Sequence, residues 1–121
     1  METWQEVLRK NSIASLEALS DKFGAEHFPD LDRLRQAADN FEFRISPAMV
    51  DIIKSPGDPI WLQYVPSVEE LDVVDGIVDS LNEDGHSPVP NITHRYPDRA
   101  LFLVSPVCAT YCRFCTRRRK V

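Results

Sequence analysis

The sequence predicts an α/β fold with a mainly helical region at residues 1–92, followed at 93–121 by a strand and a cysteine-bearing loop. Three observations predict this organisation. Apolar residues recur at helical spacing in the first forty positions. A continuous apolar run, RALFLV at 99–104, has the length of a strand. All three cysteines then fall within eight positions, in the stretch SPVCATYCRFCTRRRKV.

Two apolar stripes predict the helices of the N-terminal region. Asp30 precedes the second stripe and is a side chain of the type that caps a helix N-terminus. We expect both stripes to pack into a core. The first stripe comprises Ile13, Leu16, Leu19 and Phe23, and the second comprises Leu31, Leu34 and Ala38.

The middle of the chain alternates start signals with breaks. The stretch EFRIS (42–46) predicts a short strand or an extended segment. Ser46 followed by Pro47 predicts a helix start, because proline suits the first helical position, and SPGDP (55–59) interrupts the chain. A capping box from Ser67 to Glu70 predicts one more helix. Its apolar stripe would comprise Leu71, Val74, Val78 and Leu81, with Gly76 as a weak point.

The run at 99–104 predicts a strand buried on both faces, as in a parallel sheet. The stretch before it, 82–98, is rich in turn residues and cannot be one regular element throughout. In α/β barrels the loops that follow the strands carry the chemistry, and the cysteine loop begins where this strand ends. Since the earlier sequence does not alternate strands with helices, we expect an incomplete, TIM-type β/α barrel in a fragment of a longer enzyme.

The net charge of −5 combines an acidic region with a basic one. Residues 1–92 hold 7 Lys and Arg against 18 Asp and Glu, whereas 93–121 hold 7 against Asp98 alone. We expect the basic segment either to meet an anionic group or to be a solvated tail. The sequence lacks an apolar run long enough for a membrane span or a signal peptide, so we expect a cytoplasmic protein without a membrane partner.

The cysteines are spaced as Cys108-x3-Cys112-x2-Cys115. An odd number does not close a disulfide framework, and clustered cysteines in a cytosolic chain are more often metal ligands or redox groups. Zinc normally takes four ligands, and a Cys3His site with His94 stays an alternative. Three thiolates suit a 4Fe–4S cluster in which one iron lacks a protein ligand. Such an open position implies that a small molecule binds there.

The stretch CATYCRFC, with Phe114 before the third cysteine, resembles the signature of radical S-adenosylmethionine enzymes. The segment from Glu83 onward and the stretch RISPAMVDIIKSPGDPI resemble the lysine 2,3-aminomutase family. This resemblance implies an isomerase that moves an amino group between C2 and C3 of an amino acid, L-lysine to β-lysine in the first instance. It also implies a 4Fe–4S cluster, S-adenosyl-L-methionine as the source of a 5′-deoxyadenosyl radical, and pyridoxal 5′-phosphate.

The resemblance implies roles for the residues of the cysteine loop. Cys108, Cys112 and Cys115 would be the ligands of the cluster. Phe114 would pack near the adenosyl group of S-adenosylmethionine, with a place in the ordinary core as the alternative. Residues 93–121 would then form the start of the radical S-adenosylmethionine barrel.

The resemblance also implies anion-binding roles for the arginines. Arg95, Tyr96 and Arg99 would bind the phosphate of pyridoxal 5′-phosphate, since arginine forks and a hydroxyl suit phosphate oxygens. Salt bridges with the acidic helices are the alternative. Arg117 would pair with the substrate carboxylate, while residues 118–120 are expected to face solvent.

Other points stay open at the level of the sequence. The substrate could be lysine or glutamate, and a β-lysine synthase that serves translation-factor modification is a further alternative. A small zinc or nucleic-acid-binding module is a distant one; we expect an amino acid substrate and no nucleic acid partner. No catalytic residue is identifiable, because in the family the lysine that holds pyridoxal phosphate lies far downstream. We expect the chain alone to be inactive and the full-length protein to be a homo-oligomer.

Overall fold

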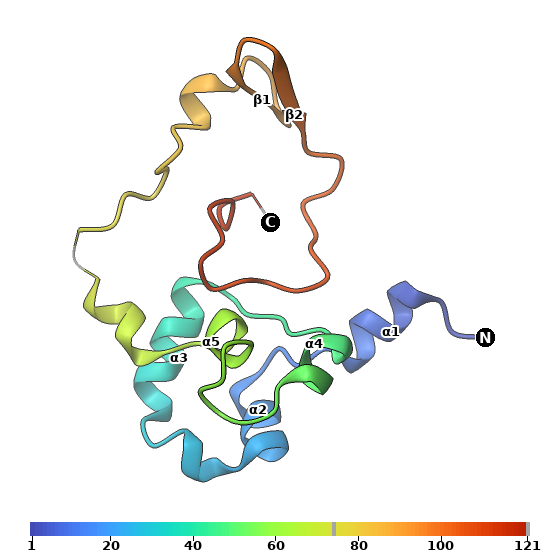
Figure 1. Ribbon diagram of the computed structural model, residues 1–121, viewed down its shortest axis with the longest axis vertical. Helices are drawn as coiled ribbons and strands as arrows, with labels where there is room; N and C mark the ends of the chain where they lie inside the picture. Colours follow the sequence, from blue (N-terminus) through green and yellow to red (C-terminus); the bar gives the residue numbers. More distant parts are fainter. Residues whose placement is uncertain (74, 121) are drawn as a thin grey trace. The chain divides into compact units, whose positions relative to one another are not determined.

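The computed structural model describes residues 1–73 and 75–120 and divides into two compact units. The first unit comprises Met1–Val74 with Ala109–Cys115, and the second comprises Asp75–Cys108 with Thr116–Val121. Most regular structure of the described residues is helical, and it is accompanied by one two-stranded antiparallel sheet (Figure 1). The cysteine loop is shared between the units, because the first unit takes it up from Ala109 to Cys115.

The first unit is built from short helices joined by tight connections (Figure 1). In chain order they are α1 (Trp4–Asn11), α2 (Leu16–Phe23), the 3₁₀ helix η1 (Ala25–His27), α3 (Leu31–Asn40), α4 (Pro47–Ile52), α5 (Trp61–Tyr64) and the 3₁₀ helix η2 (Val68–Asp72).

Side-chain caps fix where α1, α2 and α3 begin, and a proline stands at the start of α4. The predicted cap Asp30 is confirmed, because its carboxylate accepts a hydrogen bond from the Arg33 N–H at 3.0 Å. Pro47 occupies the start of α4, also as predicted. The first cap, a reciprocal capping box between Thr3 and Glu6 that starts α1, was not predicted.

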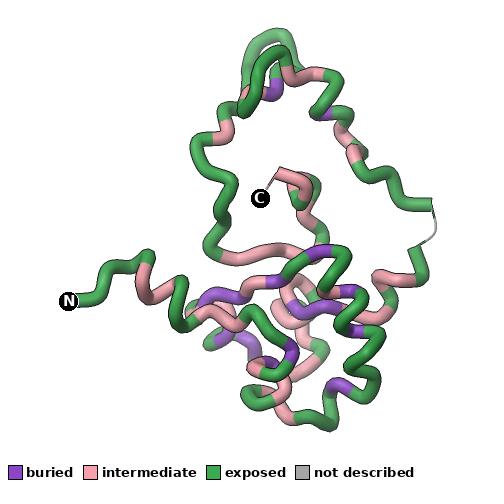
Figure 2. The backbone as a smooth tube through the Cα atoms, turned by 180° about the vertical axis from the view of Figure 1, so that it is seen from behind, coloured by how far each residue is buried: buried purple, intermediate pink, exposed green. Residues whose placement is uncertain are grey.

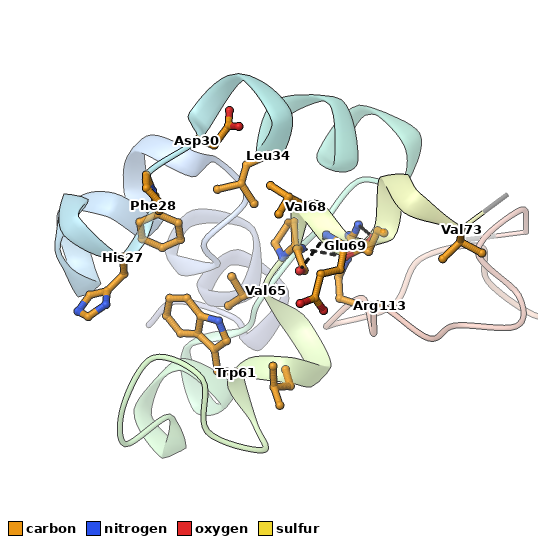
Figure 3. Close-up of a pocket in the computed structure, with 15 residues that line it drawn as sticks. His27, Phe28, Asp30, Leu34, Trp61, Val65, Val68, Glu69, Val73 and Arg113 are labelled. Carbon is orange, nitrogen blue, oxygen red and sulfur yellow. Dashed lines mark hydrogen bonds and ion pairs between the residues drawn. The ribbon is translucent and has the colours of Figure 1, made fainter.

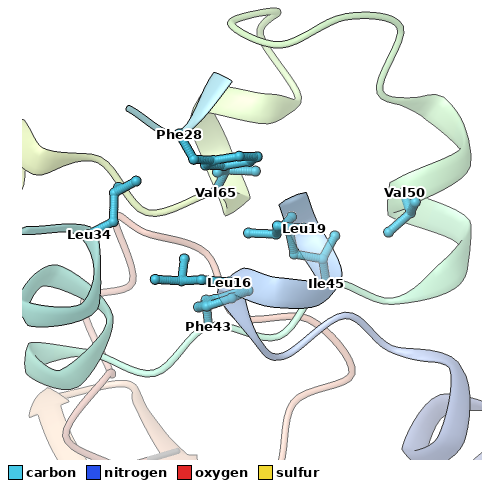
Figure 4. Close-up of a cluster of buried hydrophobic side chains, with 8 residues drawn as sticks. All are labelled: Leu16, Leu19, Phe28, Leu34, Phe43, Ile45, Val50 and Val65. Carbon is cyan, nitrogen blue, oxygen red and sulfur yellow. The ribbon is translucent and has the colours of Figure 1, made fainter. Parts of the chain in front are cut away.

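Apolar side chains from α2, α3, α4 and the segment between α3 and α4 form the core of this unit (Figure 4). Leu19 and Ile45 are completely buried, and the buried positions of the backbone lie mainly in this unit (Figure 2). The first predicted stripe packs into the core, although Ile13 lies before α2 and outside any helix. The second stripe is shifted, because α3 buries Leu34 and Ala37. The buried cluster comprises Leu16, Leu19, Phe28, Leu34, Phe43, Ile45, Val50 and Val65.

The stretch predicted as a short strand at 42–46 is extended and makes one antiparallel bridge. Ile45 pairs with Ile13 through two backbone hydrogen bonds of 2.9 Å. This bridge ties the segment after α3 to the segment before α2, so the core is closed by chain segments far apart in the sequence.

The helix predicted after Ser67 is much shorter than expected. The capping box forms, with the Ser67 N–H donating to Glu70 Oε1 at 3.0 Å. However, it starts the 3₁₀ helix η2, which ends at Asp72, and Val73 is already extended. Of the predicted stripe, Val74 lies outside the described residues, and Val78 is 67% exposed. A stripe without a surface to cover does not gain enough to stabilise a helix.

The second unit contains the 3₁₀ helix η3 (Asp84–His86) and the strands β1 (Ile92–Tyr96) and β2 (Arg99–Phe102). The strands form an antiparallel hairpin, in which Ile92 faces Phe102 and Tyr96 faces Arg99. The predicted strand is therefore present, but the prediction that both its faces are buried in a parallel sheet was wrong. Its partner β1 precedes it directly, and Phe102 is 64% exposed. No barrel is formed by the residues described.

The helices found in 1–73 and 75–120 do not include one that is both long and apolar enough to cross a membrane.

We predict that Leu19→Ala lowers the free energy of unfolding by about 2–5 kcal/mol, because it leaves a cavity in a fully buried position. Leu62→Ala is the matched control, since Leu62 is 65% exposed and its truncation should change stability by no more than about 0.5 kcal/mol. Urea unfolding followed by circular dichroism measures both. Equal losses would contradict the placement of the core.

Candidate functional site

A cavity of about 320 Å³ beside the β1–β2 hairpin brings together four predicted site residues. Its lining includes Arg95, Tyr96 and Arg99, the predicted phosphate ligands, together with Arg117, the predicted partner of the substrate carboxylate. Glu83, a residue that the sequence analysis did not single out, also lines it. The cavity lies near the lower end of the volumes of roughly 300–1,000 Å³ that small-molecule sites occupy.

The hairpin explains why Arg95, Tyr96 and Arg99 share one cavity. Successive side chains of a strand normally point to opposite faces, but the register of β1 is irregular between Thr93 and Tyr96. Such an irregularity re-aims side chains, and Arg95 and Tyr96 both line the cavity although they are adjacent. Across the hairpin, the Arg99 guanidinium lies over the Tyr96 ring, 4.6 Å from its centroid.

The exposure of these side chains leaves them accessible to an anion. The side chain of Arg99 is 68% exposed, and its carboxylate partner is the neighbouring Asp98 at 3.7 Å. Tyr96 is 51% exposed. The alternative for Arg99 was a salt bridge with an acidic helix, and among the described residues Arg99 pairs with Asp98 instead. A nearby pair of cationic and hydroxyl donors at the surface is suited to phosphate oxygens.

Arg117 is paired with a buried carboxylate. Its Nη2 lies 2.9 Å from Oε1 of Glu83, whose side chain is 3% exposed. Neither Oε2 of Glu83 nor Nε of Arg117 has a hydrogen-bond partner among the residues described. The guanidinium therefore already holds one carboxylate oxygen at the cavity wall, and part of its donor capacity remains unused.

Arg119 and Lys120, which follow Arg117, also have carboxylate partners within the second unit. Arg119 pairs with Asp79 at 3.0 Å and with Asp84, and Lys120 Nζ lies 2.8 Å from Asp84. The prediction that these cations face solvent was wrong for Arg119 and Lys120, whose side chains are 23% and 21% exposed. It is confirmed for Arg118, which is exposed. Asp79, Glu83 and Asp84 together form what we call the acidic turn.

Two carboxylates of the acidic turn, those of Asp79 and Asp84, have lowered pKa values. Hydrogen bonds from Lys120 and then Arg119 lower the pKa of Asp84. For Asp79, the backbone N–H groups of Asp84 and Glu83 are the main cause of a lowered pKa, with Arg119 adding to it. Both N–H groups donate to Asp79 at 2.9 Å. Backbone hydrogen bonds within the acidic turn thus orient the Asp79 carboxylate that pairs with Arg119.

The three cysteines are free of disulfide bonds and differ in exposure. Cys108 is exposed and belongs to the second unit, whereas Cys112 and Cys115 are half-buried and belong to the first. A backbone hydrogen bond of 3.0 Å from the Cys115 N–H to the Cys112 carbonyl closes a turn between them. The described ranges 1–73 and 75–120 contain no group of three or more His, Cys, Asp or Glu side chains gathered to hold a metal ion.

Two aromatic side chains flank the cysteine loop. Phe114 is 67% exposed, so the alternative that it fills the core is wrong and its ring is accessible. Tyr64, at the end of α5, lies against Cys112. Burial raises the pKa of Tyr64, and the charge of Cys112 and a hydrogen bond with it add to that shift.

The sequence as a whole is similar to that of a group of isomerases. The chain is 43% identical over 117 residues to L-lysine 2,3-aminomutase of Methanococcus maripaludis, which covers 92% of this chain and 27% of the relative. It is 39% identical over 121 residues to L-lysine 2,3-aminomutase of Fusobacterium nucleatum, which covers 97% of this chain and 27% of the relative. The chain is homologous to L-lysine 2,3-aminomutases.

The similarity covers only part of the relatives' length, and it extends to an aminomutase named for another amino acid. The chain spans about a quarter of the length of these L-lysine 2,3-aminomutases. It is also 36% identical over 90 residues to the glutamate 2,3-aminomutase of Clostridioides difficile, covering 73% of this chain and 21% of the relative. No family model matches the chain, and no solved structure matches it.

We predict that Lys120→Gln raises the pKa of Asp84 toward its ordinary value of 3.8 and changes that of Asp79 much less. Lys120 is the first cause of the shift at Asp84, whereas backbone N–H groups dominate at Asp79. Carboxyl carbon shifts in an NMR pH titration measure both groups.

The same shifts set a pH window for the attachment of the basic segment. Because both folded pKa values are lowered, the stabilisation is complete above about pH 4 and is lost as the pH falls through the folded values. An Asp84 midpoint that does not move in Lys120→Gln would contradict the pairing.

Proposed function

We propose that this chain forms part of a radical S-adenosylmethionine, pyridoxal 5′-phosphate-dependent amino acid 2,3-aminomutase that converts L-lysine to β-lysine. The observation that carries the proposal is the C-x3-C-x2-C thiol set in a chain homologous to L-lysine 2,3-aminomutases over most of its length. The activity is proposed for the whole protein, since this chain spans about a quarter of such relatives.

The thiols fit the proposed cluster by their chemistry. Cys108, Cys112 and Cys115 are soft donors, and thiolates are the usual protein ligands of iron–sulfur clusters. Three protein donors would leave one iron open for S-adenosylmethionine. When bound, the cluster and S-adenosylmethionine supply a radical that abstracts hydrogen from the substrate. The exposed ring of Phe114 is proposed to cover the adenosyl group.

The hairpin cavity fits the phosphate end of pyridoxal 5′-phosphate. Arg95 and Arg99 offer guanidinium forks and Tyr96 a hydroxyl, and all three line the same space. Their role is to fix the cofactor by its phosphate, while the cofactor itself supplies the chemistry at the substrate nitrogen. Arg117, at the wall of this cavity, is proposed to orient the amino acid by its carboxylate.

The partner of Arg117 refines this assignment. Glu83 pairs with Nη2 of the guanidinium, and the Arg117 side chain is still 39% exposed, so a substrate carboxylate would bind at the part of the guanidinium that Glu83 does not cover. The buried Glu83 carboxylate would keep the guanidinium in place for a substrate, because separating the pair would leave a buried charge without its partner.

L-Glutamate is the second candidate substrate, because the chain is also similar to a glutamate 2,3-aminomutase. The residues described do not distinguish the two, since a side-chain amine and a side-chain carboxylate would be recognised by groups other than those of the hairpin cavity. Incubating the full-length protein with each amino acid, followed by chromatography of the β-amino acid product, decides between them. The division at residue 92, cytoplasmic location and a homo-oligomeric full-length protein stay predictions.

We predict that the chain, reconstituted without oxygen with iron and sulfide and then reduced, gives an electron paramagnetic resonance signal of a 4Fe–4S cluster. Adding S-adenosylmethionine should change that signal, because the ligand occupies the open iron. Cys115→Ala should lose the signal, while Ser105→Ala, outside the cysteine set, should keep it. Stoichiometric zinc without a cluster, or a signal indifferent to S-adenosylmethionine, would contradict the proposal.

We predict that Arg99→Gln weakens the binding of pyridoxal 5′-phosphate by roughly tenfold or more, because a charge-assisted hydrogen bond contributes about 1.5–3 kcal/mol. Binding of pyridoxal, which lacks the phosphate, should not change. Absorbance titrations of the full-length protein measure both ligands, with Arg118→Gln as the exposed arginine control. An equal loss for the two ligands would show that Arg99 does not bind the phosphate.

A further inference from the structure

One arginine of the cysteine loop is buried in the helical unit. Arg113 lies between Cys112 and Phe114, and its side chain is 6% exposed. It borders a cavity of about 480 Å³ whose apolar wall includes Phe28, Leu34 and Trp61 (Figure 3). Cationic side chains are rarely buried unless their charge and donors are satisfied, so the contacts of Arg113 indicate what this burial achieves.

The charge of Arg113 is met by a two-point contact with Glu70. Nε of Arg113 donates to Oε1 at 2.9 Å, and Nη2 donates to Oε2 at 2.6 Å. Parallel bonds between a guanidinium and a carboxylate fix orientation as well as distance. Glu70 is itself held, because the same Oε1 accepts the backbone N–H of Ser67 in the capping box of η2. The loop arginine is therefore fastened to a carboxylate that cannot swing freely.

The remaining donors of Arg113 bind the C-terminal end of α3. Nη1 donates to the Phe41 carbonyl at 2.7 Å, and Nη2 donates to the Ala37 carbonyl at 3.3 Å. Carbonyls at the end of a helix lack partners within the helix and attract cations. The guanidinium also lies 5.0 Å from the centroid of the Phe41 ring. Arg113 thus joins α3 to η2 through a single side chain.

The backbone on either side of Arg113 is attached to the same unit. The Tyr111 N–H donates to the Arg44 carbonyl at 2.8 Å, and the Arg113 N–H donates to the Gln63 carbonyl at 2.8 Å. Thr110 Oγ1 donates to Ser46 Oγ at 2.8 Å. The segment that contains Cys112 is therefore bound at three points, on both sides of the cysteine and without any metal, and the turn to Cys115 follows it directly.

We infer that Arg113 and Glu70 are positioning residues for the proposed cluster, and that they hold Cys112 and Cys115 in a fixed arrangement in the metal-free protein. The helical unit would then support two of the three proposed cluster ligands. This inference rests on the proposed function for the identity of the metal group, but the positioning itself can be tested without metal.

The first experiment measures the metal-free thiols. In Arg113→Gln, alkylation by iodoacetamide should become several-fold faster at Cys112 and Cys115, because their backbone is no longer held. The rate at Cys108, which is already exposed, should stay as it is and serves as an internal control. Peptide mass spectrometry gives the rate for each cysteine. Arg118→Gln is the matched arginine variant and should leave all three rates unchanged.

The second experiment measures the cluster. We expect Arg113→Gln to lose iron to a chelator about 10- to 100-fold faster than the parent chain, the range usual for groups that support metal ligands. Arg113→Lys keeps the charge without the fork and should lie between the two. Glu70→Gln removes the charge of the partner and should act in the same direction. Circular dichroism selects a temperature at which every variant keeps the helical content of the parent.

The outcomes separate the inference from the proposed function. A parent chain that takes up no cluster overturns the proposed function, while the alkylation rates still decide the positioning. Unchanged alkylation and iron loss in Arg113→Gln overturn the inference even if the cluster forms. Should Arg113→Gln fail to fold, Arg113→Lys and Glu70→Gln decide, and rates equal to those of the parent in both would also overturn it.

Discussion

The burial of one guanidinium connects the parts of the helical unit. Arg113 reaches from the cysteine loop to Glu70 and to the last carbonyls of α3, elements more than forty residues earlier in the sequence. A buried charge is costly unless every strong donor is satisfied, so this side chain constrains all the groups around it. The end of α3, the start of η2 and the loop between Cys112 and Cys115 must keep their mutual geometry for the charge to remain paired.

Electrostatic pairing within the second unit follows a different logic. Arg119 and Lys120 pair with Asp79 and Asp84 near the surface, where partly exposed pairs contribute little individually and are screened by salt. The exception is Arg117, whose partner Glu83 is buried. The segment after the cysteines thus has one firm attachment and two weaker ones, and the firm one lies at the wall of the hairpin cavity. Cations of the basic C-terminal region thus pair with carboxylates of the acidic region within the same chain.

Local signals in the sequence predicted local structure well. Asp30 and Pro47 begin their helices as expected, and Leu16 and Leu19 lie in the core, because capping and periodicity depend on neighbours a few positions away. The long helix predicted after Ser67 does not form, because its apolar stripe has no surface to cover. The strand at 99–102 was found, but its partner was missed because β1 lies in a stretch dominated by turn residues.

The candidate site divides in the same way. The cysteines could be singled out from their spacing and residue type, and Arg95, Tyr96, Arg99 and Arg117 from the family resemblance; the cavity brings these four residues together. Glu83 could not, nor could the contact between Glu70 and Arg113, because their partners are 34 and 43 positions away. Only tertiary structure joins positions that distant.

Glu70 performs two tasks with one carboxylate, since it caps the 3₁₀ helix η2 and neutralises Arg113. The acid and the base of this ion pair therefore cannot exchange positions. An exchange of the two charges would leave a cation facing the Ser67 amide, which requires an acceptor, and a carboxylate facing the carbonyls of α3, which require donors. In related chains that keep this architecture, positions 70 and 113 should therefore change together to neutral residues. The acid and the base should not exchange positions.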